Sequence, residues 1–159
     1  MPPEPMIDLA LIDANNVAVS REEIYRVNPH RHEFQQLDGI FFMDYDRGLM
    51  AGYRDVRDDE FWVRGHIPSR PLMPGVLIIE AAAQLVSYYM QSDERYAKGD
   101  FLGFGGVDGV KFRGVVEPGD RLIILGKMIE VRPRRCLGAT QGLVNGQMVY
   151  EGMITGMWL

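Results

Sequence analysis

The stretch that decides the fold is VLIIEAAAQLVSYYM, residues 76–90. It contains neither glycine nor proline and is longer than an ordinary strand, which predicts a helix. Pro74 lies just before it and suits a first helical turn, where the missing N–H needs no partner. Apolar residues occur nearly all round this helix, so we expect it to lie buried at the centre of the domain.

Strand patterns lie on both sides of the central helix. Residues 39–45 and 49–56 predict a β-hairpin, and residues 101–104, 107–115, 121–131, 137–144 and 147–157 predict further strands. Asn145-Gly146 is a strong signal for a two-residue hairpin turn, because both residues accept positive φ. This order predicts an α+β fold, in which an antiparallel sheet wraps around one long helix.

The chain of 159 residues is long enough for one domain, which we place over residues 1–159. Ser20 and Glu23 have the spacing of a capping box, so a short helix is expected to begin there and to end at Pro29. The Pro-rich, acidic start predicts that residues 1–19 are a partly mobile segment.

The composition is that of a globular domain, with 47% hydrophobic and 25% charged residues. The net charge of −5 disfavours a nucleic-acid partner. No apolar run approaches the roughly 20 residues of a membrane helix, and the start lacks the features of a secretory signal. We therefore expect no membrane association and a cytoplasmic location.

The main candidate for a functional segment is residues 64–75, RGHIPSRPLMPG, which end at the start of the central helix. Prolines and glycines make this a stiff loop that can hold the imidazole of His66 in one place. At Pro74 and Gly75 the unpaired N–H groups and the dipole of the helix favour developing negative charge. Gly75 also lets a substrate carbonyl approach the backbone closely.

Glu80 is the one ionisable residue between Pro74 and Ser87, on a helix expected to be buried. Burial disfavours a carboxylate, so we expect the pKa of Glu80 to be raised and the group to act as a proton donor. Gln84 lies one turn later on the same face and can hydrogen-bond it. With His66, these groups suit an elimination next to a carbonyl.

Other interpretations of these residues stay open. His66 can be a turn residue with local hydrogen bonds, and Glu80 can be the buried half of an ion pair with Arg64, Lys111 or Arg113. Further alternatives are a metal site at His30 and His32 and a reactive thiol at Cys136 beside arginines. No carboxylate or cysteine cluster supports the metal site, and a cysteine in a strand is more often inert.

Residues 65–84, GHIPSRPLMPGVLIIEAAAQ, strongly resemble the signature of the FabZ-type 3-hydroxyacyl-ACP dehydratases. Residues 28–34 are similar to the Pro-His-Arg segment of that family, and residues 106–113 with 118–120 to its third block. The resemblance implies a hotdog fold and a hydro-lyase of fatty-acid biosynthesis or a related acyl pathway. It also implies a homodimer, or a trimer of dimers, whose active sites take histidine from one subunit and glutamate from the other.

Carried over residue by residue, the resemblance makes His66 the base that removes the C2 proton. Glu80 protonates the departing 3-hydroxyl, and Gln84 orients Glu80. The Gly75 N–H polarises the thioester carbonyl, and Pro74 and Ile67 line the substrate site. The implied partner is an acyl carrier protein with an acyl chain on 4′-phosphopantetheine, and no metal or organic cofactor is implied.

The sequence also departs from the family pattern. Ile67 and Ser69 stand where Phe and Gly are usual, and Gln35-Gln36 replaces an apolar pair. These changes leave the acyl chain length and the oligomer contacts open. Two other functions remain as alternatives, an acyl thioesterase of the same fold and a non-catalytic acyl-binding protein. The basic run Arg132-Pro133-Arg134-Arg135 is the best linear candidate for docking an acidic carrier protein.

Overall fold

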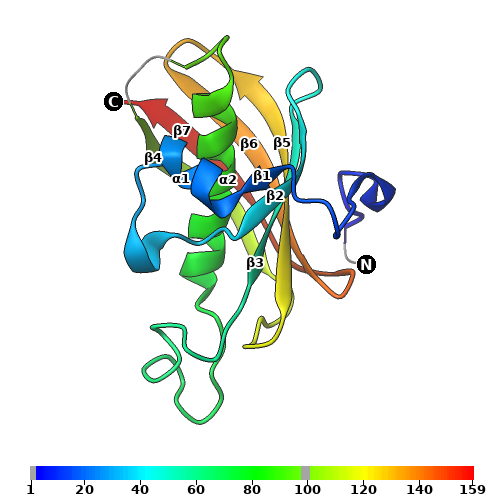
Figure 1. The fold of residues 1–159 in the computed structure, drawn as a ribbon, viewed down its shortest axis with the longest axis vertical. Coiled ribbons are helices and arrows are strands. Elements are labelled where there is room, and N and C mark those ends of the chain that lie inside the picture. Colours follow the sequence, from blue (N-terminus) through cyan, green and yellow to red (C-terminus); the bar gives the residue numbers. More distant parts are fainter. Residues whose placement is uncertain (1–2, 98–100) are drawn as a thin grey trace.

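The centre of the fold is helix α2 (Gly75–Ser92), which matches the helix predicted for residues 76–90. The computed structural model describes residues 3–97 and 101–159. Figure 1 shows α2 lying along one face of a strongly twisted sheet, with the short helix α1 (Arg21–Val27) beside it. The predicted arrangement of one long helix and an antiparallel sheet is therefore confirmed.

The sheet is antiparallel, with the order β1-β2-β3-β5-β6-β7-β4. Its strands are β1 (Val19–Ser20), β2 (Gly39–Asp44), β3 (Leu49–Asp55), β4 (Leu102–Phe112), β5 (Arg121–Val131), β6 (Arg135–Val144) and β7 (Gln147–Trp158). The strand β4 forms one edge of this sheet. This α+β architecture is the hotdog fold that the resemblance implies.

The strand β4 differs from the prediction of two separate strands at residues 101–104 and 107–115. It is one strand, and its register against β7 shifts between Phe104 and Gly106 and again between Asp108 and Lys111. Gly109 has φ +60, which glycine adopts without steric cost. Such bulges bend a strand without ending it, which explains why the apolar pattern is interrupted although the pairing continues.

The main core lies between α2 and the sheet. Leu85 of α2 is fully buried, as are Met50 of β3 and Ile124 of β5, and all belong to one apolar cluster. Although α2 is rich in apolar residues, no helix in the described ranges is both long and apolar enough to cross a membrane.

Local signals in the sequence are confirmed at two points. The Ser20 hydroxyl accepts a hydrogen bond from the Glu23 N–H at 3.2 Å, and α1 ends just before Asn28 and Pro29. In the hairpin between β6 and β7, Asn145 and Gly146 have φ values of 50° and 77°. Both φ values are those of the hairpin turn predicted there.

The N-terminal segment covers the face of the sheet that is turned away from α2. Ile7 is 2% exposed and packs with Ala51, Leu125 and Leu143 in a second apolar cluster. Gln141 of β6 accepts a hydrogen bond from the Met6 N–H at 2.8 Å. The expected mobility of residues 1–19 stays a prediction, and residues 1–2 lie outside the described part.

Candidate active site

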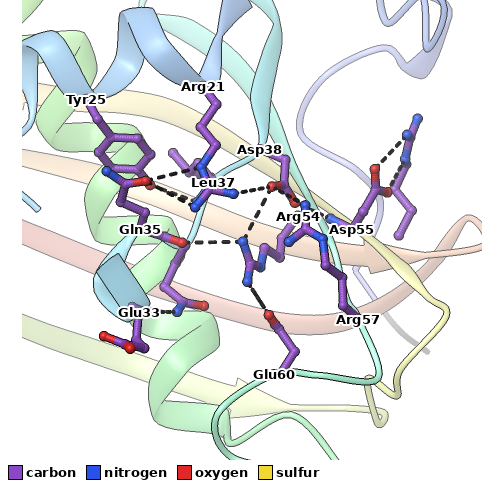
Figure 2. A network of polar contacts seen from close by, with 12 residues as sticks. Arg21, Tyr25, Glu33, Gln35, Leu37, Asp38, Arg54, Asp55, Arg57 and Glu60 are labelled. Atoms are coloured by element: carbon purple, nitrogen blue, oxygen red, sulfur yellow. Dashed lines mark hydrogen bonds and ion pairs between the residues drawn. The ribbon is translucent and has the colours of Figure 1, made fainter. Parts of the chain in front are cut away.

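The loop of residues 56–74 leads from β3 to α2 and carries His66 (Figure 1). A buried ion pair holds its beginning, because Arg54 of β3 contacts both carboxylate oxygens of Glu60. Figure 2 shows that Arg54 also reaches Asp38, at 3.4 Å. Met73 holds the other end through a hydrogen bond from its N–H to the Val116 carbonyl at 2.7 Å. The loop is therefore held to β3 before His66 and to the connection between β4 and β5 after it.

His66 is oriented by the loop itself. Its Nδ1 lies 2.7 Å from the carbonyl oxygen of Leu72, and the ring is half-buried. A carbonyl oxygen only accepts, so neutral His66 carries its proton on Nδ1 and keeps a lone pair on Nε2. This tautomer is the one that a general base needs at Nε2.

Backbone strain occurs directly after His66. Ile67 has φ +55, a conformation that β-branched residues rarely adopt, and its side chain is 46% exposed. The turn that requires this conformation is closed by a hydrogen bond from the Arg70 N–H to the Ile67 carbonyl at 2.9 Å. The unusual φ at Ile67 belongs to the same turn that aims the imidazole.

Glu80 lies on α2, where its side chain is 23% exposed. Its Oε1 is 3.4 Å from Nε2 of His30 and accepts a hydrogen bond from Nε2 of Gln84 at 3.0 Å. The hydrogen bond with His30 outweighs the effect of burial and, helped by Gln84, lowers the pKa of Glu80. The expectation of a raised pKa is therefore wrong, because it counted burial and missed the histidine.

The prediction that Gln84 hydrogen-bonds Glu80 is confirmed, and Gln84 makes other hydrogen bonds as well. Its Oε1 accepts from the Tyr25 hydroxyl at 2.7 Å and from the Gln36 N–H at 3.1 Å. Its Nε2 donates to the Phe34 carbonyl at 2.6 Å. Since both ends of the amide are engaged, Gln84 can present only an N–H to Glu80.

A small cavity of about 60 Å³ lies against this polar cluster. Its polar lining includes Glu80, Gln84, Ser87 and His30, while β4 and β7 contribute Leu102, Phe104 and Ile154. The carboxyl group of Glu80 therefore lies at the wall of a small, mainly apolar cavity.

Pro74 and Gly75 stand at the N-terminus of α2, ahead of Glu80 on the same helix. Pro74 caps the helix with φ −57, and its carbonyl accepts from the Leu77 N–H at 2.9 Å. A Cβ at position 75 would lie 2.6 Å from Cζ of Phe112, so any larger residue there would require the Phe112 ring to shift. The expected approach of a substrate carbonyl to the Gly75 N–H stays a prediction.

Within one chain, the structure brings only some of the predicted site residues into contact. Glu80 and Gln84 are in contact, whereas His66 and Ile67 lie in the loop that precedes α2. Sequence reasoning missed the place of His30, to which it gave no role besides that of a possible metal ligand with His32. The signal was the Pro-His-Arg segment of residues 29–31, which follows α1 directly.

The structure also bears on two of the alternative interpretations, at Arg113 and at Cys136. Arg113, one proposed ion-pair partner of Glu80, lies 3.1 Å from Glu151 instead. Cys136 is buried, and burial raises the pKa of its thiol to about 11. A thiolate is therefore disfavoured at Cys136, as expected for an inert cysteine in a strand.

Comparison with solved structures identifies the class of fold. The dehydratase heterocomplex ApeI:P from Xenorhabdus doucetiae aligns with a TM-score of 0.69 at 16% identity, covering 86% of this chain and 90% of that chain. Zebra fish thioesterase superfamily member 2 aligns with a TM-score of 0.65 at 10% identity, covering 87% and 95%. At these identities the likeness shows the fold alone, a hotdog domain shared by dehydratases and thioesterases.

Sequence comparison identifies the family. A family model described as FabA-like domain matches residues 28–153. The 3-hydroxyacyl-[acyl-carrier-protein] dehydratase FabZ of Clostridium botulinum (strain Okra / Type B1) is 36% identical over 81% of this chain and 88% of that protein. The FabZ of Caldicellulosiruptor bescii is 37% identical, over 82% and 92%. The chain belongs to the FabZ-type dehydratase family.

Proposed function

We propose that this chain is a 3-hydroxyacyl-[acyl-carrier-protein] dehydratase, a hydro-lyase that converts a (3R)-hydroxyacyl thioester into a trans-2-enoyl thioester and water. The observation that carries the proposal is the identity of 36% and 37% with named dehydratases over most of the chain. Fatty-acid biosynthesis, or a related acyl pathway in the cytoplasm, is the setting in which such a substrate occurs.

The residues of the site can divide the reaction between them. His66 removes the proton from C2 through the free lone pair of Nε2, which the Leu72 carbonyl leaves available. Glu80 protonates the hydroxyl that leaves C3, and Gln84 keeps the carboxyl in place. The Gly75 N–H, at the N-terminus of α2, polarises the thioester carbonyl and so makes the C2 proton more acidic.

A second copy of the chain is proposed to complete the site. The edge strand β4 exposes Phe104, Val107 and Phe112, by 48%, 37% and 50%, along a row of backbone groups that another strand can pair with. An apolar edge of this kind favours pairing of two copies. In the paired form, His66 of one copy is expected to face Glu80 of the other.

An acyl carrier protein is the proposed partner. Arg132 and Arg134 lie in the exposed turn between β5 and β6, and Arg135 begins β6 beside them. Glu130 neutralises part of the charge of this turn by contacting Arg132 and Arg135. Arg95 and Arg132 also share the lining of a neighbouring cavity with Trp158. This basic turn suits an acidic carrier whose 4′-phosphopantetheine arm delivers the acyl chain.

Product analysis tests the reaction. With 3-hydroxyacyl-ACP of several chain lengths, wild type is expected to produce an enoyl thioester, which absorbs in the ultraviolet. His66→Ala and Glu80→Gln should each lose at least about 100-fold in rate. Release of free thiol would identify a thioesterase instead, and equal inertness of wild type and His66→Ala would identify an acyl-binding protein.

Mixing the two inactive variants tests the shared site. If His66 and Glu80 of one site come from different copies, heterodimers of His66→Ala with Glu80→Gln contain an intact site and regain activity. Val107→Lys, at the exposed edge, should dissociate the copies and abolish activity. Leu11→Lys, at a comparably exposed site on the N-terminal segment, is the matched control. It should change neither the association of the two copies nor the activity.

Charge reversal tests the docking surface. Replacing Arg132, Arg134 and Arg135 by Glu should raise KM for carrier-bound substrate at least about tenfold, with little change for a small thioester analogue. Equal effects on both substrates would contradict docking at this turn.

A further inference from the structure

The polar cluster at the cavity contains a histidine to which the proposed reaction gives no role. His30 comes from the segment between α1 and the 3-10 turn at His32–Phe34, and its Nε2 lies 3.4 Å from Glu80 Oε1. Both residues line the same cavity. Nδ1 of His30 is buried without a hydrogen-bond partner among the described residues, so Glu80 is the group with which this ring can exchange a proton.

The hydrogen bonds of Gln84 imply that Glu80 needs another group beside it to supply a proton. Because its amide is held at both ends, Gln84 can only donate a hydrogen bond to Glu80, and a donated hydrogen bond favours the ionised carboxylate. An ionised carboxylate cannot protonate a departing hydroxyl. A proton must therefore be held beside Glu80, and in the described part of the chain His30 is the titratable group that faces it.

We propose that His30 is a positioning residue that holds the proton which Glu80 delivers to the departing hydroxyl. This inference rests on the proposed dehydratase function and assigns the source of the acid within it. The pair of His30 and Glu80 then works with a single shared proton.

The proton balance of the step is complete. His66 of the second copy takes the C2 proton, and the electrons of that C–H bond form the C2–C3 double bond. The C3–O bond breaks as the single proton of the pair passes from His30 through Glu80 to the departing oxygen, which leaves as water and leaves Glu80 ionised. At the end His66 is protonated and His30 is neutral, so proton exchange with solvent restores both residues.

The pH profile separates this role from simple packing. In wild type, the alkaline limb of kcat/KM is expected to report loss of the last proton from the pair. In His30→Gln, the carboxyl alone can hold that proton, and carboxyls ordinarily lose it near pH 4.3, well below the imidazole value of about 6.5. The alkaline limb should therefore move to lower pH, and kcat should fall about 100-fold.

His32→Asn is the matched control. His32 is an exposed histidine two residues away, and its φ of +55 is a conformation that Asn accepts. The His32→Asn variant should therefore have the same kcat and the same alkaline limb as wild type. His30→Asn serves as a second variant if His30→Gln fails to fold. A fall in rate with an unmoved alkaline limb in both variants would overturn the proposal, because it would leave His30 a merely structural role.

A measurement without turnover tests the contact itself. A ¹³C titration of the Glu80 carboxyl is expected to show a higher pKa in His30→Ala than in wild type, because alanine has no donor to replace the hydrogen bond that most lowers this pKa. An unchanged pKa would also overturn the proposal. Failure of the dehydratase function would look different, since wild type itself would then form no enoyl thioester.

Discussion

The hydroxyl of Tyr25 lies 2.7 Å from Oε1 of Gln84, and both side chains are buried. The same hydroxyl accepts a hydrogen bond from the Leu37 N–H at 2.9 Å. Helix α1 is thereby linked through one phenol to the amide that faces Glu80. Burial raises the pKa of Tyr25 to about 12, so the hydroxyl keeps its proton and remains a donor to Gln84.

Removing this hydroxyl is expected to destabilise the protein. Tyr25→Phe leaves the Leu37 N–H without a partner and removes one of the two hydrogen bonds to Gln84 Oε1, at a cost of about 1–3 kcal/mol in the free energy of unfolding. Urea denaturation measures the loss. Tyr53→Phe is the matched control, since that ring stacks on Phe41 at 4.4 Å and should retain its packing. A loss as large in Tyr53→Phe would contradict the special role of the Tyr25 hydroxyl.

The ion pair at the start of the loop predicts a non-additive effect. Side chains of Arg54 and Glu60 are 6% and 7% exposed, so Arg54→Met leaves a buried carboxylate uncompensated and should cost about 3 kcal/mol. The double variant Arg54→Met with Glu60→Met should recover part of that loss. Arg47→Met breaks the exposed contact with Asp44 and should cost less than about 1 kcal/mol. No recovery in the double variant would argue against the pair.

Stability should depend on pH through Glu80. Its pKa is lowered in the folded protein, mainly by His30, so its ionised form is favoured there. This contribution is fully present above the unfolded value of about 4.3 and is lost as the pH falls through the folded pKa. The difference in unfolding free energy between wild type and Glu80→Gln should thus be constant near neutral pH and shrink in acid. A difference that grows in acid would contradict the lowered pKa.

Relieving the strain at Ile67 should stabilise the fold. Asn accepts φ +55 far better than a β-branched residue, so Ile67→Asn is expected to gain about 1 kcal/mol in the free energy of unfolding. Ile129→Asn provides the comparison, because Ile129 is 53% exposed in a strand and should lose stability instead. Thermal unfolding of both variants measures these changes. A lower stability of Ile67→Asn would show that the loss of apolar surface outweighs the relief of backbone strain.

Much of the fold followed from patterns that act over a few residues. The helix over residues 76–90, the cap at Ser20 and the turn at Asn145 were predictable because propensity, capping and turn geometry depend on near neighbours. The bulges of β4 were not, because an extra residue in a ladder is defined by the partner strand. Gln84 was found as a neighbour of Glu80, since both lie one turn apart on α2.

The sequence by itself determined the residue types, the single long helix and the hydrogen bond between Glu80 and Gln84, because these depend on spacing along the chain. Only the tertiary structure decided the electrostatics of Glu80. His30 stands fifty residues earlier, and the return of the chain after α1 brings its imidazole to 3.4 Å from the carboxylate. The sign of the Glu80 pKa shift follows from that contact, because a nearby hydrogen-bond partner outweighs the burial that the sequence predicted.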